Sequence, residues 1–253
     1  MIKYLQRENI GIITLNRPDK RNSLHPVLIN QLADKLVQLE QESTIETIIL
    51  TGEGTSFCAG ADLEYLNTLT KNSLVDNERD SELLVQMFLL LYNFSKPTIA
   101  AVNGPAIAGG CGLASVCDFI FAHPSISKFG FSEVKIGFIP AIVSSFLIKK
   151  LGEGKATQML LSGEIIDGKK AFEIGLVNQL SENVLEDSII FAKKLTSNSV
   201  NSMIQTKRMI RNISGMNIKE AVRYCQKLNT ISRTTDDFKN GINNFLSKTK
   251  REQ

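Results

Sequence analysis

The chain has 253 residues, of which 43% are hydrophobic and 22% charged, with a formal net charge of +3 and a pI near 8.6. This size suits one globular domain, or one domain with an appendage. The charge is too small to indicate a nucleic-acid partner, and no apolar run approaches the length of a membrane span. No charged leader precedes an apolar stretch at Met1, so we expect a soluble, cytoplasmic protein without a membrane partner.

The first predicted elements form a strand-helix-strand unit. Strands are expected near Ile10–Leu15 and over residues 46–50, with a helix over Pro26–Gln41 between them. One face of this helix is apolar at helical spacing and consists of Leu28, Leu32, Leu36 and Leu39. The apolar face predicts packing of the helix against a core.

Two glycine-rich turns, residues 51–63 and 103–113, share one pattern. Each follows a short apolar strand, the second over Thr98–Val102, and each opens a helix with small residues. Such a helix start leaves backbone N–H groups accessible, and the helix dipole favours negative charge there. A single turn of this kind fits close packing equally well, but the repeat favours one oxyanion shared by the two turns.

Further helices are expected over residues 81–94 and from Gly109, and strands over residues 118–122 and 128–131. The pattern of two strands and a helix then recurs about every fifty residues, which is typical of stacked repeating units. After residues 175–178 the sequence becomes polar and helix-favouring, with no strand pattern. Apolar residues on one face of residues 184–195 and 218–228 fit packing against the rest of the chain.

Several ordered motifs resemble the enoyl-CoA hydratase/isomerase (crotonase) superfamily. The motifs are residues 15–24, both glycine-rich turns, residues 129–140, the sequence Gly175-Leu176-Val177 and residues 245–248. The resemblance covers nearly the whole chain and implies an α/β fold. It implies a spiral of β-β-α units with the active site over residues 1–195, and an all-helical region over residues 196–253. In this family that region forms trimers, often stacked in pairs, so the resemblance predicts a homotrimer or a dimer of trimers.

The resemblance also implies an enzyme that hydrates the 2,3 double bond of an enoyl-CoA thioester. The Ala61 and Gly109 N–H groups would hold an enolate, and Glu133 would carry the proton, with a pKa raised by its apolar surroundings. Coenzyme A is then part of the substrate, and no separate cofactor or metal is expected.

Residues for binding the coenzyme are carried over from the same motifs. At least one of the basic residues Arg17, Lys20 and Arg21 is expected to contact a phosphate, although a solvated turn is the ordinary interpretation. The adenine pocket is implied to be lined by Ala59, Ala61, Asp62 and Leu63. Further substrate contacts are assigned to Ser23, Leu24, Gly110, Ala141, Phe245 and Lys248.

Gly112 departs from the family pattern, because family hydratases commonly have a second glutamate there. Three alternatives follow: Glu133 alone serves as acid and base, another carboxylate enters the site, or the reaction is double-bond isomerisation. The nearby acids are Asp62, Glu64 and Asp118. We interpret Asp118 as a structural residue at a helix-to-strand junction, and Asp62 as a cap of the first turn. A catalytically silent acyl-CoA-binding protein is the alternative outside enzymes.

Residues 133–144 together with Gly112 resemble the branch of the superfamily assigned to 3-methylglutaconyl-CoA hydration. A substrate carboxylate would then need a cationic or hydroxyl partner, for which Lys135, Ser144 and Ser145 are candidates. Surface charge and a helix start are their ordinary interpretations.

The four cysteines, Cys58, Cys111, Cys117 and Cys225, have no CxxC spacing, which disfavours a zinc site and a disulfide framework. We interpret them as reduced and structural. His25 and His123 show no nucleophile-base arrangement, so a thioesterase ranks below hydration and isomerisation. Neither a P-loop nor a GxGxxG fingerprint is present, so ATP and NAD chemistry are not expected.

Overall fold

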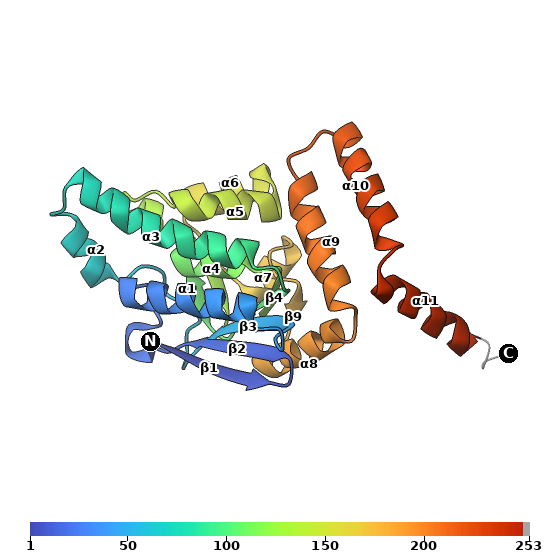
Figure 1. Cartoon of the computed structure of the whole chain (residues 1–253). Helices are drawn as coiled ribbons and strands as arrows, with labels where there is room; N and C mark the ends of the chain where they lie inside the picture. Colours follow the sequence, from blue (N-terminus) through green and yellow to red (C-terminus); the bar gives the residue numbers. More distant parts are fainter. Residues whose placement is uncertain (250–253) are drawn as a thin grey trace. The chain divides into compact units, whose positions relative to one another are not determined.

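The computed structural model describes residues 1–249, with side chains as far as Ser247 (Figure 1). The chain divides into two compact units, Met1–Leu195 and a second that begins at Thr196. No helix in the described part combines the length and apolar character that crossing a membrane requires.

The first unit is built on a six-stranded sheet with the order β1-β2-β3-β4-β6-β9. Its strands are β1 (Ile2–Arg7), β2 (Ile10–Leu15), β3 (Thr47–Gly52), β4 (Thr98–Val102), β6 (Phe119–Ala122) and β9 (Gln179–Leu180). β1 and β2 are antiparallel, and every later neighbour pair is parallel. A smaller sheet has the order β5-β7-β8, with β5 (Pro105–Ile107), β7 (Lys128–Gly130) and β8 (Ile165–Asp167).

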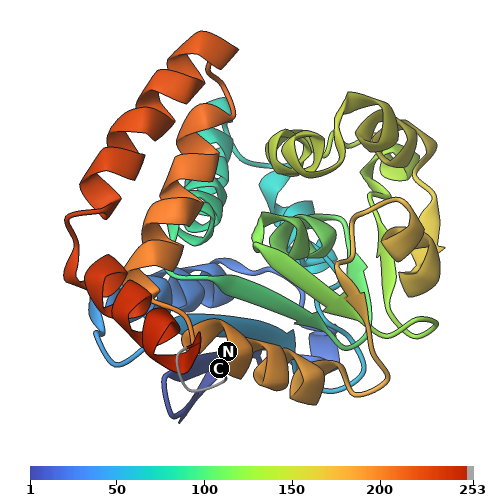
Figure 2. The same ribbon diagram turned by 90° about the vertical axis from the view of Figure 1, so that its right-hand side faces the viewer.

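Both faces of the large sheet are covered by helices (Figure 2). The helices and 3-10 turns of this unit are η1 (Pro18–Lys20), α1 (Pro26–Gln41), α2 (Leu63–Leu69), α3 (Leu74–Asn93), α4 (Gly109–Val116), η2 (Glu133–Ile136), α5 (Ala141–Leu151), α6 (Glu153–Ser162), α7 (Gly168–Glu173) and α8 (Val184–Thr196). Successive residues of a strand point to opposite faces. In β4, Ala100 and Val102 therefore join the core under α1, α3 and α4, whereas Ile99 and Ala101 join the core under α8.

Most predicted elements are confirmed within a few residues, and the differences have local causes. The predicted helix over residues 81–94 begins earlier, at Leu74, because the Ser73 hydroxyl accepts a hydrogen bond from Asp76 N–H and caps it. The expectation of no strand after residue 178 is wrong. Gln179–Leu180 forms β9, whose two residues are too few to give a periodic signal, and pairs with β6.

The second unit contains the helices α9 (Val200–Ile213), α10 (Ile218–Ser232) and α11 (Asp236–Thr249). Each is amphipathic, yet Ala221 is the one residue described in this unit that is buried. Large apolar side chains remain exposed, with Ile218 at 76%, Ile231 at 61% and Val222 at 59%. These helices therefore have almost no core of their own.

Candidate active site

The two glycine-rich turns lie against each other. Cys58 of the first forms a parallel bridge with Ala106 of the second. Cys58 N–H donates to the Pro105 carbonyl at 3.1 Å, and Ile107 N–H donates to the Cys58 carbonyl at 3.0 Å. These bonds fix the backbone just before each predicted N–H donor.

Glycine is required for this approach. A methyl group at Gly110 would lie 2.0 Å from the Cys58 carbonyl oxygen, and one at Gly60 would lie 2.8 Å from the Ile107 carbonyl oxygen. Gly60 is also near the second donor, since the same added methyl would be 3.4 Å from Gly109 N. The two turns can therefore approach this closely only because Gly60 and Gly110 have no side chains. Ala61 is the residue after Gly60.

Ala61 and Gly109 present backbone donors with no protein acceptor among the residues that the structure describes. Gly109 is the first residue of α4, where the helix dipole reinforces a free N–H. The preceding Ala108 has φ 53° and ψ −125°, a conformation that side chains disfavour and that commonly marks functional sites. Its N–H donates to the Gly130 carbonyl at 2.7 Å. The pair of donors can hold one oxyanion.

Glu133 begins η2, three residues after Gly130, whose carbonyl holds Ala108. Its side chain is buried, and its Oε2 atom has no hydrogen-bond partner in the described chain. Burial raises the pKa of Glu133 because a desolvated carboxylate loses its hydration. A buried carboxyl with one oxygen left without a partner is suited to exchanging a proton with a ligand.

Gly112 faces an apolar side chain from α5. A methyl group at Gly112 would lie 2.1 Å from Val143 Cγ1 and 2.7 Å from Val143 Cβ, with Phe88 Cε1 at 3.5 Å. A glutamate at this position would thus collide with Val143. Sequence reasoning identified the missing carboxylate but not what replaces it, although a lone glycine within a helix does signal close packing.

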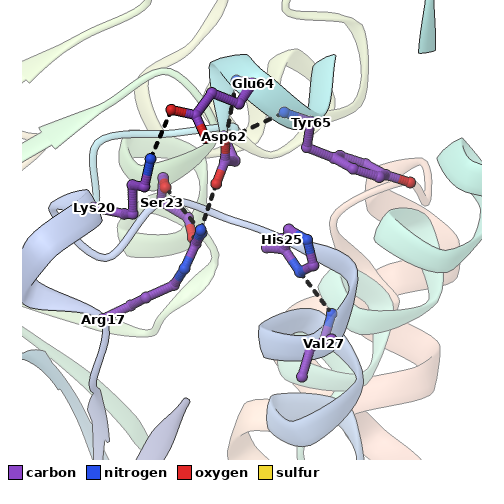
Figure 3. Close-up of polar contacts among 8 residues, drawn as sticks. All are labelled: Arg17, Lys20, Ser23, His25, Val27, Asp62, Glu64 and Tyr65. Carbon is purple, nitrogen blue, oxygen red and sulfur yellow. Dashed lines mark hydrogen bonds and ion pairs between the residues drawn. The ribbon is translucent and has the colours of Figure 1, made fainter. Parts of the chain in front are cut away.

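The three basic residues before the first turn have different environments, and Figure 3 shows those of Arg17 and Lys20. The Arg17 guanidinium forms an ion pair with Asp62, and Lys20 pairs with Glu64 at 2.7 Å. Arg21 is exposed, and no ion-pair partner is found for it among the described residues. Its carbonyl accepts from Ala59 N–H at 3.0 Å, which fixes it beside the first turn.

The other nearby acids have structural contacts. The Asp62 side chain caps α2 by accepting from the Glu64 and Tyr65 N–H groups, as predicted. Burial raises the pKa of Asp62, but hydrogen bonds from Arg17 and Tyr65 N–H more than offset this, so the pKa lies below its ordinary value. Asp118 accepts from Thr98 N–H at 2.8 Å, which confirms its structural role at the junction with β6.

The remaining predicted contacts are spread over the chain. Leu24 is buried and pairs with Ala61, whereas Leu63 is 70% exposed. Ala141 is exposed at the start of α5. In the second unit Phe245 is exposed, and the Lys248 side chain lies outside the described residues.

The three residues proposed to bind a substrate carboxylate do not form one cluster. Lys135 is exposed in η2, and Ser145 is exposed in α5. The Ser144 hydroxyl already donates to the Pro140 carbonyl. None of these three side chains therefore stands out as a preformed carboxylate site.

The cysteines and histidines have structural environments. Burial raises the pKa of Cys58 and of Cys111 to about 12 in each case, so both thiols stay protonated and are poor nucleophiles. The four cysteines, all within the described residues, form no disulfide. His25 caps α1, and His123 Nδ1 accepts from the Ser125 and Ile126 N–H groups.

Comparison with known proteins gives consistent matches over the whole chain. The family described as "Enoyl-CoA hydratase/isomerase" matches residues 6–253. A 2,3-dehydroadipyl-CoA hydratase of Escherichia coli is 32% identical, over 96% of this chain and 94% of the relative. A mitochondrial enoyl-CoA hydratase of Pongo abelii is also 32% identical, over 97% and 83%. The crystal structure of an enoyl-CoA hydratase from Shewanella pealeana matches with a TM-score of 0.93 at 26% identity, covering 98% of this chain and 93% of that one.

Proposed function

The chain belongs to the enoyl-CoA hydratase/isomerase family and is an enzyme of that family, and we propose that Glu133 catalyses the hydration of an enoyl-CoA thioester without a second carboxylate. The observation that carries this proposal is the buried Glu133 carboxyl, whose Oε2 has no partner among the described residues, on a segment tied by Gly130 to the residue before the Gly109 donor. Activity on enoyl-CoA thioesters is what the family and its hydratase relatives support.

Both steps of the reaction follow from these groups. The Glu133 carboxylate removes a proton from water while the water oxygen bonds to C3, and the electrons of the double bond move to the thioester oxygen. The Ala61 and Gly109 N–H groups stabilise the resulting enolate. Glu133 then returns its proton to C2, so that one water molecule supplies both new substituents. The chemistry needs no metal or separate cofactor.

Isomerisation is the second candidate because one carboxylate suffices for it. Glu133 would remove a proton from C2 of a 3-enoyl thioester and deliver it to C4, through a dienolate held by the same two N–H groups. The apolar contact between Gly112 and Val143 favours this alternative, since it leaves no second side chain to orient water. Identification of the products separates the two reactions.

For the acyl group of the substrate, the specific candidate is 3-methylglutaconyl-CoA, which follows from the resemblance of residues 133–144 and Gly112 to that branch of the superfamily. The E. coli relative is named for 2,3-dehydroadipyl-CoA, another thioester that ends in a carboxylate. Exposed Lys135, two residues from Glu133, is the cation available on the same 3-10 turn. We expect a carboxylate-bearing substrate to lose activity when Lys135 is neutralised, while crotonyl-CoA does not.

For the coenzyme, Arg21 is the best phosphate contact of the three basic residues. Arg17 is engaged inside the protein, and Lys20 is held by Glu64. Arg21 is exposed and fixed to Ala59 at the first turn. A guanidinium in this place suits the diphosphate or the 3′-phosphate of coenzyme A.

We propose that the protein is cytoplasmic and forms a homotrimer or a dimer of trimers. The second unit supports this proposal because it has almost no core and its apolar side chains are exposed. Contact with other subunits would bury these side chains. A monomeric mass in analytical ultracentrifugation at micromolar concentration would contradict the expectation.

The decisive experiment measures turnover of crotonyl-CoA, 3-methylglutaconyl-CoA and a 3-enoyl-CoA, with products identified by mass and chromatography. Glu133→Gln is the test variant, because it keeps the shape of the side chain but cannot carry the proton. Water addition that depends on Glu133 supports the hydratase, and a shifted double bond supports the isomerase. Thioester binding without turnover of any substrate would instead support the silent binding protein.

A further inference from the structure

The Arg17 side chain contacts Ser23 and Asp62, which belong to two segments far apart in the sequence (Figure 3). One guanidinium nitrogen, Nη2, lies 2.5 Å from Asp62 Oδ2. The other, Nη1, donates to the Ser23 carbonyl at 3.1 Å and to the Ser23 hydroxyl at 3.2 Å. One planar fork therefore joins the residue after Ala61 to the residue before Leu24.

Those two segments are the ones that orient Ala61. Leu24 N–H donates to the Gly60 carbonyl at 2.7 Å, and Asp62 N–H donates to the Leu24 carbonyl at 3.0 Å. In this parallel bridge the groups of Gly60 and Asp62 face Leu24, so the N–H of Ala61 points to the opposite edge. Its direction depends on the bridge remaining closed.

Burial makes this ion pair different from its neighbour on the surface. The side chains of Arg17 and Asp62 are only 13% and 6% exposed, whereas those of Lys20 and Glu64 are 39% and 81% exposed. Exposed pairs contribute little, but removing one partner of a buried pair leaves an uncompensated charge that the surroundings must rearrange to hydrate. Loss of Arg17 is thus expected to displace Asp62, and with it the bridge.

Both oxygens of the Asp62 carboxylate are engaged in contacts within the protein. Its Oδ1 accepts from Glu64 N–H at 3.0 Å and from Tyr65 N–H at 3.2 Å, while Oδ2 faces Arg17. The carboxylate therefore links the start of α2, the Arg17 fork and the peptide that follows the donor.

We infer that Arg17 is a positioning residue for the oxyanion site: acting through Asp62 and Ser23, it holds the Ala61 N–H in the direction that polarises the thioester carbonyl. This inference rests on the proposed function of that site. It assigns Arg17 to the chemical step, whereas Arg21, four residues later, contributes to coenzyme binding.

The test compares Arg17→Met and Arg17→Lys with Arg21→Met and with Lys3→Met, which removes only the exposed pair with Glu53. We expect Arg17→Met to lower kcat about tenfold to hundredfold with KM within threefold, since losing one oxyanion donor costs on the order of a hundredfold or more. Arg17→Lys should recover part of kcat, because an ammonium keeps the charge but cannot span both segments. Arg21→Met should instead raise KM, and Lys3→Met should change neither constant.

A second measurement separates positioning from partial unfolding and does not require turnover. The probe is 4-dimethylaminocinnamoyl-CoA, whose absorption moves to longer wavelength when its carbonyl is polarised. Wild-type protein should produce that shift, and Arg17→Met should reduce it for each bound molecule, whatever fraction of the sample is folded. Unchanged kcat and an unchanged shift in Arg17→Met would overturn the inference. If the wild type hydrates no substrate but shifts the probe, and Arg17→Met reduces that shift, the proposed function fails while the positioning role stands. A wild type that neither turns over nor shifts the probe would overturn both.

Discussion

Gly112→Ala is the smallest change that tests the packing of α4 against α5. The new methyl would lie 2.1 Å from Val143 Cγ1 and 2.7 Å from Val143 Cβ, whereas carbon atoms normally pack at about 3.5–4.0 Å. Rotation of Val143 moves Cγ1 but not Cβ, so the two helices must separate. Overpacking of this kind costs about 1–3 kcal/mol, and the better helix propensity of alanine offsets up to about 1 kcal/mol. We expect a net destabilisation of about 1–2 kcal/mol.

The assay is a double-mutant cycle with Val143→Gly, measured by denaturant unfolding at one fixed protein concentration. Val143→Gly alone leaves a cavity and should also destabilise the protein. Together the changes should cost less than their sum, by about 1 kcal/mol or more, because the added methyl enters the space that Val143 vacates. Additivity within about 0.5 kcal/mol would refute the idea that the two positions compete for one space. By the same reasoning, Gly112→Glu should require Val143→Gly to yield folded protein.

Other predictions concern the charged and thiol groups. Burial raises the pKa of Glu133 in the folded state, so the ionised carboxylate destabilises the fold at neutral pH. This destabilisation disappears below the ordinary pKa of 4.5, where the carboxyl is protonated in both the folded and the unfolded state. Glu133→Gln should therefore have the higher Tm at pH 7, with a gap that closes toward pH 4; an equal Tm throughout would count against the raised pKa. Cys58→Ala should keep turnover within a few-fold, because burial raises the pKa of this thiol to about 12; a hundredfold loss would implicate the thiol. Arg21→Met should raise KM for coenzyme A thioesters several-fold and make KM less dependent on salt concentration. An unchanged KM would show that Arg21 does not contact the coenzyme.

Local signals explain which parts of the fold could be predicted. Helix α1 is predictable within its observed bounds because its leucines follow one face at helical spacing, and the structure adds that His25 caps its start. Strands β2 and β4 were likewise placed at their observed bounds, since each is a short apolar run bounded by a turn. Strand β9 gave no such signal, because pairing with β6 rather than local preference makes it a strand.

The active site could be predicted only in part from the sequence, for a related reason. The donors and Glu133 could be named from motifs, but the partner of a charge lies elsewhere in the chain. The sequence predicts that at least one of Arg17, Lys20 and Arg21 contacts a phosphate but does not distinguish among them, and the Arg17 guanidinium pairs with Asp62, 45 residues later. The contact of Gly112 with Val143 depends in the same way on how two helices pack.

Unlike Glu133, the two oxyanion donors at the paired turns are difficult to detect by alanine scanning. Such a scan deletes side-chain atoms, whereas the groups proposed to hold the substrate oxygen belong to the main chain and survive every deletion. Sensitivity should appear instead wherever an atom is added: a methyl at Gly52, Gly104 or Gly110 would lie between 2.0 and 2.2 Å from a backbone oxygen. In a saturation screen of these three positions, all substitutions should therefore reduce activity about equally, regardless of polarity or charge. The screen would show that the active site depends on the absence of side chains at these glycines.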